Sequence, residues 1–145
     1  MFLRRTLRII PAMTTGMEWL IDAAGCEPAR LADLGRMRAL CEAIVADLRL
    51  GVIGEPRWHQ FPPPGGVTGI YLLTESHLAC HTFPELGVAT FNLYCCRPRT
   101  AWPWERQLSE QFGAARVSVR CMPRGGTAMA AERNAVRSAV VGEGK

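Results

Sequence analysis

Residues 67–96 read VTGIYLLTESHLACHTFPELGVATFNLYCC, and the pattern of this segment is the strongest indication of the fold. Residues 67–74 are apolar and β-branched, residues 77–83 alternate between two faces, and residues 87–96 are again apolar, so each segment predicts a strand. No segment of helical length separates these three strands. Parallel neighbours need a long crossover connection, so the three strands are expected to pair antiparallel.

Further elements flank this stretch on both sides. Residues 18–23 and 52–61 predict strands before it, the second of them interrupted by a proline, and residues 116–122 predict a strand after it. Residues 31–48 and 102–112 carry apolar side chains at helical spacing. The pattern predicts an α+β fold, a two-layer sandwich in which two helices pack on one face of an antiparallel sheet.

The chain is expected to form a single domain between two irregular ends. Its 145 residues and 48% hydrophobic content are typical of one globular unit. We expect residues 1–15 to be a flexible arm, residues 16–124 to form the domain and residues 125–145 to be a loose tail. A core of this size leaves little depth for a closed site, which favours a site shared between two subunits.

Charge and cysteine content limit the class of partner. The net charge is +4, but the basic residues are scattered, which argues against a nucleic-acid surface. No apolar stretch approaches the length of a membrane span. The six cysteines form no C-x-x-C pair and follow no secretory signal, so we expect reduced thiols in a cytoplasmic protein. Buried structural roles are expected for Cys26, Cys41, Cys80, Cys121, Trp102 and Trp104.

Residues 67–96 also contain many reactive side chains. It brings hydroxyl, imidazole, carboxylate and thiol groups together beside apolar strands, and such groups gather at functional sites. The candidate residues are Glu75, Ser76, His77, Cys80, His81, Glu85, Cys95 and Cys96.

Two other kinds of site use the same residue types. His77 and His81 share a face of a strand and, with Cys80 or Cys96, are the ligand types of zinc, but a structural zinc site favours paired ligands on tight turns. A serine hydrolase of the G-x-S-x-G type would need an elbow that this sequence lacks. No metal is therefore expected.

The order of short motifs in this segment is more informative about function than its composition. Glu-Ser-His at 75–77, His-Thr-Phe-Pro-Glu at 81–85 and a small-residue strand ending in cysteine resemble the prokaryotic S-adenosylmethionine decarboxylase family. The similarity extends from about Gly16 to Gly125 and includes Trp58-His59-Gln60-Phe61. It implies a pyruvoyl-dependent enzyme that cuts itself between Glu75 and Ser76 into chains 1–75 and 76–145.

The resemblance implies a role for each matching residue. Ser76 becomes the covalent pyruvoyl cofactor, which binds the substrate as a Schiff base. His81 is the proton acceptor during self-processing, and Cys96 is the proton donor during decarboxylation. Glu85 and Phe61 contact the substrate.

For Ser76 and His81 to act on each other, the strand that carries them must be interrupted. Ser76 and His81 are five residues apart and nominally face opposite sides of a strand, so a turn or bulge at the cleavage point is expected. Strand register favours Cys96 over Cys95 as proton donor, and His77 is expected to be structural.

The implied reaction is decarboxylation of S-adenosylmethionine to the aminopropyl donor of spermidine synthesis. The resemblance also implies a homodimer of processed chains, with no nucleic-acid or membrane partner. Two alternatives stay open, namely a pyruvoyl-dependent decarboxylase of ornithine or arginine and a homologue that no longer processes and acts as a binding or regulatory subunit.

The sequence departs from the family pattern at a few positions. Gly16-Met17-Glu18-Trp19-Leu20 stands where the family usually has Gly-x-His-Leu, an insertion with Trp19 in place of the histidine. Asn92 stands where relatives are often acidic, and three prolines occupy residues 62–64. These departures are expected to alter substrate choice and not to touch Ser76, His81 or Cys96.

Overall fold

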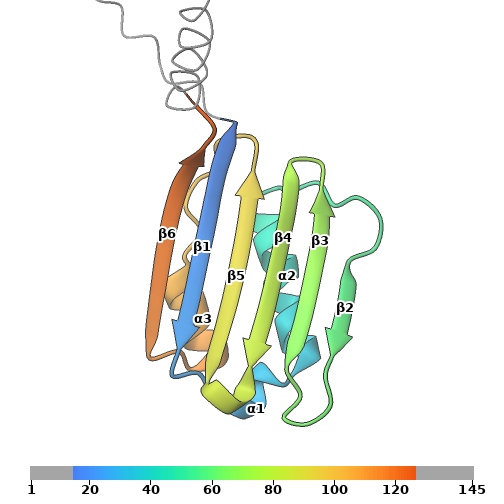
Figure 1. Cartoon of the computed structure of the whole chain (residues 1–145), viewed down its shortest axis with the longest axis vertical. Helices are drawn as coiled ribbons and strands as arrows, with labels where there is room; N and C mark the ends of the chain where they lie inside the picture. Colours follow the sequence, from blue (N-terminus) through green and yellow to red (C-terminus); the bar gives the residue numbers. More distant parts are fainter. Residues whose placement is uncertain (1–14, 127–145) are drawn as a thin grey trace, which may run out of the picture.

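The computed structural model describes residues 15–126, which form two layers, a sheet and a set of helices on one of its faces (Figure 1). The elements in chain order are β1 (Gly16–Ala24), α1 (Pro28–Leu31), α2 (Leu34–Asp47), β2 (Arg57–Gln60), β3 (Val67–Leu73), β4 (Ser76–Phe83), the 3-10 turn η1 (Pro84–Leu86), β5 (Val88–Cys95), α3 (Trp104–Phe112) and β6 (Arg116–Arg124). None of the helices in this part of the chain is long and apolar enough to cross a membrane.

The sheet has the strand order β2-β3-β4-β5-β1-β6, and every neighbouring pair is antiparallel. The three strands of residues 67–96 lie side by side, β3 next to β4 and β4 next to β5. Strand β1 lies between β5 and β6, so the first strand of the fold pairs with the last. The predicted α+β sandwich with an antiparallel sheet is confirmed.

The helices bury one apolar face each against the sheet. Helix α2 begins at Asp33, whose side chain accepts a hydrogen bond from the backbone N–H of Arg36 at 3.0 Å and so satisfies a free donor of the first turn. Helix α3 ends at Gly113, which takes the left-handed conformation that favours glycine (φ 68°). The buried helix residues recur at spacings of three and four: Met37, Leu40, Cys41 and Ile44 on α2, and Trp104, Leu108 and Phe112 on α3.

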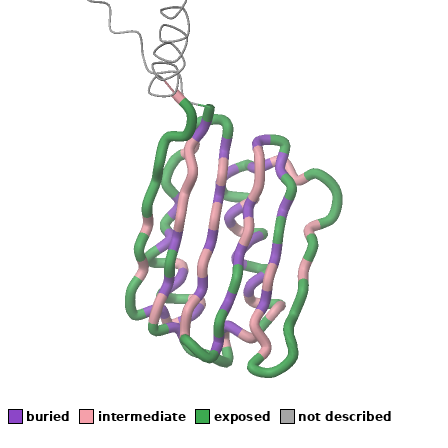
Figure 2. The backbone as a smooth tube through the Cα atoms, viewed as in Figure 1, coloured by how far each residue is buried: buried purple, intermediate pink, exposed green. Residues whose placement is uncertain are grey.

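Buried and exposed residues alternate along the strands, as Figure 2 shows. On β4 the side chains of Leu78, Cys80 and Thr82 are buried, and on β5 the same is true of every second residue from Ala89 to Cys95. The remaining strand residues point to the face that carries no helix. That open face therefore presents both polar groups and exposed apolar side chains, a point that the site depends on.

Three expectations from the sequence need correction. The helix predicted over residues 31–48 begins later, at Leu34, because Leu31 ends the separate helix α1 and Asp33 caps a new helix. The strand predicted over residues 52–61 shrinks to β2, since Pro56 lacks the N–H that a strand ladder needs. Cys121 is exposed, because it lies on the edge strand β6.

Other expectations are confirmed or fall outside the described chain. Trp102 and Trp104 are buried in the core, and so are Cys26, Cys41 and Cys80. The flexible arm (1–15) and the loose tail (125–145) lie almost entirely outside the described residues.

Candidate active site

The Glu75–Ser76 peptide bond lies at the tip of the β3–β4 hairpin. Leu73 pairs with Ser76, so the connection is a two-residue turn made of Thr74 and Glu75. Ser76 has φ 144°, a backbone conformation that side chains other than glycine rarely adopt. Such a residue stores strain of order 1–3 kcal/mol, held in place by the surrounding structure. The turn expected at the cleavage point is present, and it is strained at Ser76.

The carbonyl group of Glu75 is hydrogen-bonded by the next strand. The backbone N–H of Cys96 donates to the Glu75 carbonyl oxygen at 2.9 Å. This contact follows from strand register, because Ser76 faces Cys95 across β4 and β5. A donor at this oxygen polarises the carbonyl and would stabilise negative charge developing on it during attack by a nucleophile.

The side chain of Glu75 is also held. It is only 9% exposed and forms an ion pair with Arg99, a residue of the segment between β5 and α3. A buried carboxylate with a hydrogen-bonded cation has little freedom to move. The residue before the peptide bond is therefore anchored through both its backbone and its side chain. Arg99 could not be predicted from local pattern, since the pair joins residues 24 positions apart.

His77 contacts the hydroxyl of Ser76. Its Nδ1 lies 3.3 Å from Ser76 Oγ, and its Nε2 lies 2.6 Å from Asn92 Oδ1 on β5. Asn92 in turn donates to Glu18 on β1 at 2.8 Å. Asn92 and Glu18 do not contact Ser76 directly, but register between three strands brings both of them into one polar network with His77, which does.

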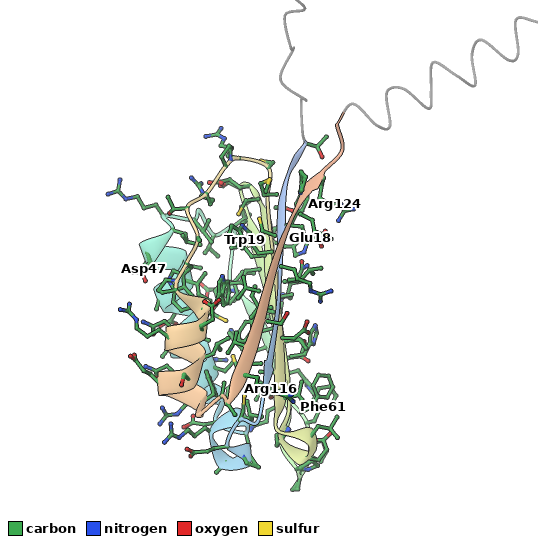
Figure 3. The ribbon with its side chains drawn as sticks, turned by 90° about the vertical axis from the view of Figure 1, so that its left-hand side faces the viewer. Glu18, Trp19, Asp47, Phe61, Arg116 and Arg124 are labelled. Carbon is green, nitrogen blue, oxygen red and sulfur yellow. The ribbon has the colours of Figure 1, made fainter. Side chains whose placement is uncertain are left out.

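The residue next to Glu18 has a different role. Trp19 is partly buried and packs against the core on the helix side of the sheet, whereas Glu18 and Arg124 lie on the opposite side (Figure 3). Alternation along β1 explains the difference. The tryptophan that replaces the relatives' histidine therefore serves packing.

The two neighbouring cysteines differ in environment. Cys95 is completely buried, and desolvation together with the nearby Glu75 carboxylate raises the pKa of its thiol. Cys96 is exposed, directly after the end of β5 and beside the strained hairpin. Exposure makes Cys96 the thiol of the pair that a bound molecule can reach.

A second group of site residues lies at the other end of β4. His81 accepts or donates a hydrogen bond with Thr68 Oγ1 through its Nδ1, at 3.0 Å. This pair borders a hollow of about 380 Å³. The residues that line the hollow are Phe61, Pro62, Pro64, Gly66, Thr68, His81, Thr82, Phe83 and Glu85. The structure thus brings Phe61, His81 and Glu85 together, and it adds Thr68, which was not predicted from the sequence.

Ser76 and His81 are not brought together within one chain. Pairing of β4 with both neighbours runs unbroken from Ser76 to Phe83, so no bulge shortens the path. Five residues of regular strand span about 16 Å. The turn expected at the cleavage point therefore does not bring Ser76 and His81 together within one chain, because it precedes Ser76 and the strand after it is regular.

A metal site finds no support in the arrangement of ligand types. Cys80 is buried on the helix side, where its sulfur lies 3.9 Å from that of Cys41, whereas His77 and His81 occupy the alternate positions of β4. Within residues 15–126 no three histidine, cysteine or acidic side chains converge as metal ligands would.

A small α+β sandwich that holds Ser76 in a strained backbone conformation, donates a hydrogen bond to the carbonyl of Glu75 and places an imidazole and a cysteine residue beside this peptide bond has the features of an enzyme that processes its own backbone. Comparison with known proteins gives the family. Residues 17–125 match the family model described as S-adenosylmethionine decarboxylase. The chain belongs to the S-adenosylmethionine decarboxylase family.

Individual relatives agree with this assignment. The chain is 37% identical to the S-adenosylmethionine decarboxylase proenzyme of Moorella thermoacetica and 35% identical to that of Pelotomaculum thermopropionicum. Each alignment covers 76% of this chain, with 87% of the Moorella protein and 86% of the Pelotomaculum protein. Its fold is similar to the crystal structure of the adenosylmethionine decarboxylase from Aquifex aeolicus, with TM-score 0.65, 30% identity and coverage of 79% of this chain and 93% of that one.

Proposed function

We propose that this chain cuts its own Glu75–Ser76 bond and then decarboxylates S-adenosylmethionine with a pyruvoyl group derived from Ser76. The observation that carries the proposal is the hairpin itself. Ser76 is strained, its hydroxyl is next to the peptide bond, and the carbonyl of Glu75 accepts a hydrogen bond from Cys96. An ordinary structural hairpin has no need of this combination.

The surroundings of Ser76 suit a covalent pyruvoyl group. Ser76 is half-buried at the end of β4, so its side chain is held and yet within reach of a substrate amine. A pyruvoyl ketone supplies an electron sink that weakens the bond to a substrate carboxylate. Cys96 is exposed beside the same hairpin and is our candidate for the thiol that returns a proton after carbon dioxide leaves.

We propose that the site is completed by a second copy of the chain. Proton transfer needs heavy atoms within hydrogen-bond reach, whereas Ser76 and His81 are about 16 Å apart along β4. In a two-fold dimer that packs open face on open face, the hairpin end of one protomer meets the His81 end of its partner, and each dimer has two equivalent sites.

The open face of the sheet has the surface that such a dimer requires. Ile70 and Leu72 on β3 are 48% and 59% exposed, and Phe83 on β4 is 39% exposed. All three lie between or beside the two groups of site residues on adjacent strands. Burial of these side chains against the same residues of a second copy would stabilise the dimer.

The hollow supports a substrate that is both aromatic and cationic. The ring of Phe61 is 52% exposed and lines the hollow together with the Glu85 carboxylate. An exposed phenyl ring suits stacking with an adenine, and a carboxylate suits a sulfonium or ribose hydroxyls. Ornithine and arginine offer a cation for Glu85 but no aromatic base for Phe61, so S-adenosylmethionine fits better.

Carbon dioxide release distinguishes the substrates. We expect the purified wild-type protein to release labelled carbon dioxide from S-adenosylmethionine and not from ornithine or arginine at the same concentration. A preference for either amino acid would overturn the substrate assignment while leaving self-cleavage intact. Absence of release from all three by an uncut protein would favour a homologue with a binding role.

Replacement of Cys96 tests the proton donor. We expect Cys96→Ala to be cut at Glu75–Ser76 like the wild type, because its contribution to the hairpin is a backbone N–H, and to decarboxylate roughly 100-fold more slowly because proton return lacks its acid. The measurement is single-turnover carbon dioxide release. Cys121→Ala, the same change at the other exposed cysteine, serves as the control, and wild-type turnover in Cys96→Ala would reject the assignment.

The thiols also bear on location. All six cysteines are free, and four are buried. Free thiols persist in a reducing compartment. We therefore propose a cytoplasmic enzyme.

A further inference from the structure

A polar chain of four side chains leads away from the Ser76 hydroxyl. It runs from His77 on β4 through Asn92 on β5 to Glu18 on β1, and it ends in an ion pair between Glu18 and Arg124 on β6. Each link joins residues on adjacent strands of the open face, where Figure 3 places Glu18 and Arg124 on the side away from the helices.

The Glu18 carboxylate determines which groups donate and which accept along this network of hydrogen bonds. The hydrogen bond from Asn92 lowers the pKa of Glu18, against the opposing effect of burial, and the nearby Arg124 lowers it further. The carboxylate is therefore ionised at neutral pH and can only accept hydrogen bonds. Asn92 must give it an N–H, which leaves the amide oxygen, an acceptor, facing His77 at 2.6 Å.

This order of donors and acceptors selects one tautomer of the His77 ring. An acceptor at Asn92 Oδ1 requires a proton on His77 Nε2. A neutral imidazole with its proton on Nε2 has its lone pair on Nδ1, and Nδ1 is the atom that lies 3.3 Å from Ser76 Oγ. The ring is also stacked on Tyr94, with centroids 6.1 Å apart and planes 18° from parallel, so its orientation is restrained.

We propose that His77 is the base that takes the Ser76 hydroxyl proton in the first step of self-cleavage, and that Asn92 and Glu18 are positioning residues that hold it in the required form. The inference rests on the proposed function. The Ser76 oxygen bonds to the Glu75 carbonyl carbon while the Oγ proton passes to His77 Nδ1. The bond from that carbon to the Ser76 nitrogen then breaks, and His77 returns the proton to the nitrogen. An amide has become an ester and an amine, with no other reactant.

Two histidines act in successive steps of self-cleavage. His77 lies beside Ser76 in the same chain and serves the acyl shift, whereas His81 is left for removal of the Ser76 α-proton in the following step. During the shift, the N–H of Cys96 faces the oxygen on which negative charge develops.

Variants of the three histidines of the chain, His59, His77 and His81, separate these steps. Cleavage is followed by intact mass in freshly purified protein, with and without neutral hydroxylamine, which cuts esters and leaves amides. We expect His77→Phe, which keeps a ring to stack on Tyr94, to cleave at least about 100-fold more slowly and to gain nothing from hydroxylamine. His81→Ala should accumulate the ester and be cut by hydroxylamine. His59→Phe, the matched control on β2, should cleave like the wild type.

Two further variants test the positioning residues. Asn92→Leu removes the acceptor of His77 and should slow cleavage as His77→Phe does. The double variant Glu18→Gln with Asn92→Asp moves the carboxylate from β1 to β5. There the carboxylate still accepts hydrogen bonds from His77 Nε2 and from the amide introduced on β1. This double variant should therefore cleave at close to the wild-type rate. A purely structural role would not predict recovery by this exchange.

The outcomes that overturn the inference differ from those that overturn the proposed function. Wild-type cleavage kinetics in His77→Phe, or accumulation of hydroxylamine-sensitive ester in that variant, would show that His77 does not act in the acyl shift. A double variant as slow as Asn92→Leu would remove the positioning role. An uncut wild-type chain would overturn the proposed function itself, and this inference with it.

Discussion

Ser76→Ala is expected to remain a single chain of 16.0 kDa with no decarboxylase activity, whereas the wild type separates into residues 1–75 and 76–145. The physical reason is that alanine keeps the backbone of the hairpin but has no oxygen to attack the Glu75 carbonyl. No ester forms, and no ketone can arise from the residue. Intact-mass measurement under denaturing conditions gives the result directly.

The control for this variant is Ser109→Ala, the same change on the exposed surface of α3, which should be cut like the wild type. The mass of the wild-type fragment that begins at residue 76 is equally informative. It should lack the amino group of serine and carry a ketone in its place. A Ser76→Ala protein that is still cut at this bond, or a wild-type protein that stays whole, would contradict self-processing by Ser76.

Mixing two inactive variants is expected to restore cleavage if the site spans two chains. In a dimer of one Ser76→Ala chain and one His81→Ala chain, one site has both Ser76 and His81 and the other has neither. The His81→Ala chain, uncut alone, should then be cut in every mixed dimer. Random pairing of equal amounts places about half of the His81→Ala chains in mixed dimers, so about half should be cut.

Co-expression with two different affinity tags supplies this material, and mass spectrometry identifies which chain is cut. The Ser76→Ala chain should stay whole in every dimer, which provides an internal control. Co-expression of His81→Ala with wild type measures the cut fraction when functional partners are present. An uncut His81→Ala chain in isolated mixed dimers would show that His81 acts on its own chain, and the face-to-face dimer would have to be abandoned.

A site of this kind explains why the hairpin and the hollow are built so differently. The hairpin end holds one peptide bond through contacts at Glu75, Ser76 and Cys96, and so is suited to chemistry. The hollow presents Phe61 and Glu85 on an exposed surface and is suited to recognition. The proposed dimer brings the hairpin end of one chain and the hollow of the other together.

Much of the fold was predictable from local pattern. Alternation over residues 67–96 predicted adjacent antiparallel strands, and the spacing of Trp104, Leu108 and Phe112 predicted the buried face of α3. Both patterns depend on periods of two and of about 3.6 residues, which any short segment expresses by itself. The prediction failed where a single residue interrupts a pattern, at Asp33 and at Pro56.

The reactive residues were predictable for the same reason, since Glu75, Ser76, His81 and Cys96 form an ordered motif within one segment. Their mutual distances were not. Strand register decided that Asn92 and Glu18 join the network of His77, and the path of the segment between β5 and α3 decided that Arg99 holds Glu75. The sequence by itself determined which side chains are available and which face of a strand each occupies. The tertiary structure decided which of them meet, because pairing between strands distant in the chain is set by the packing of the whole sheet.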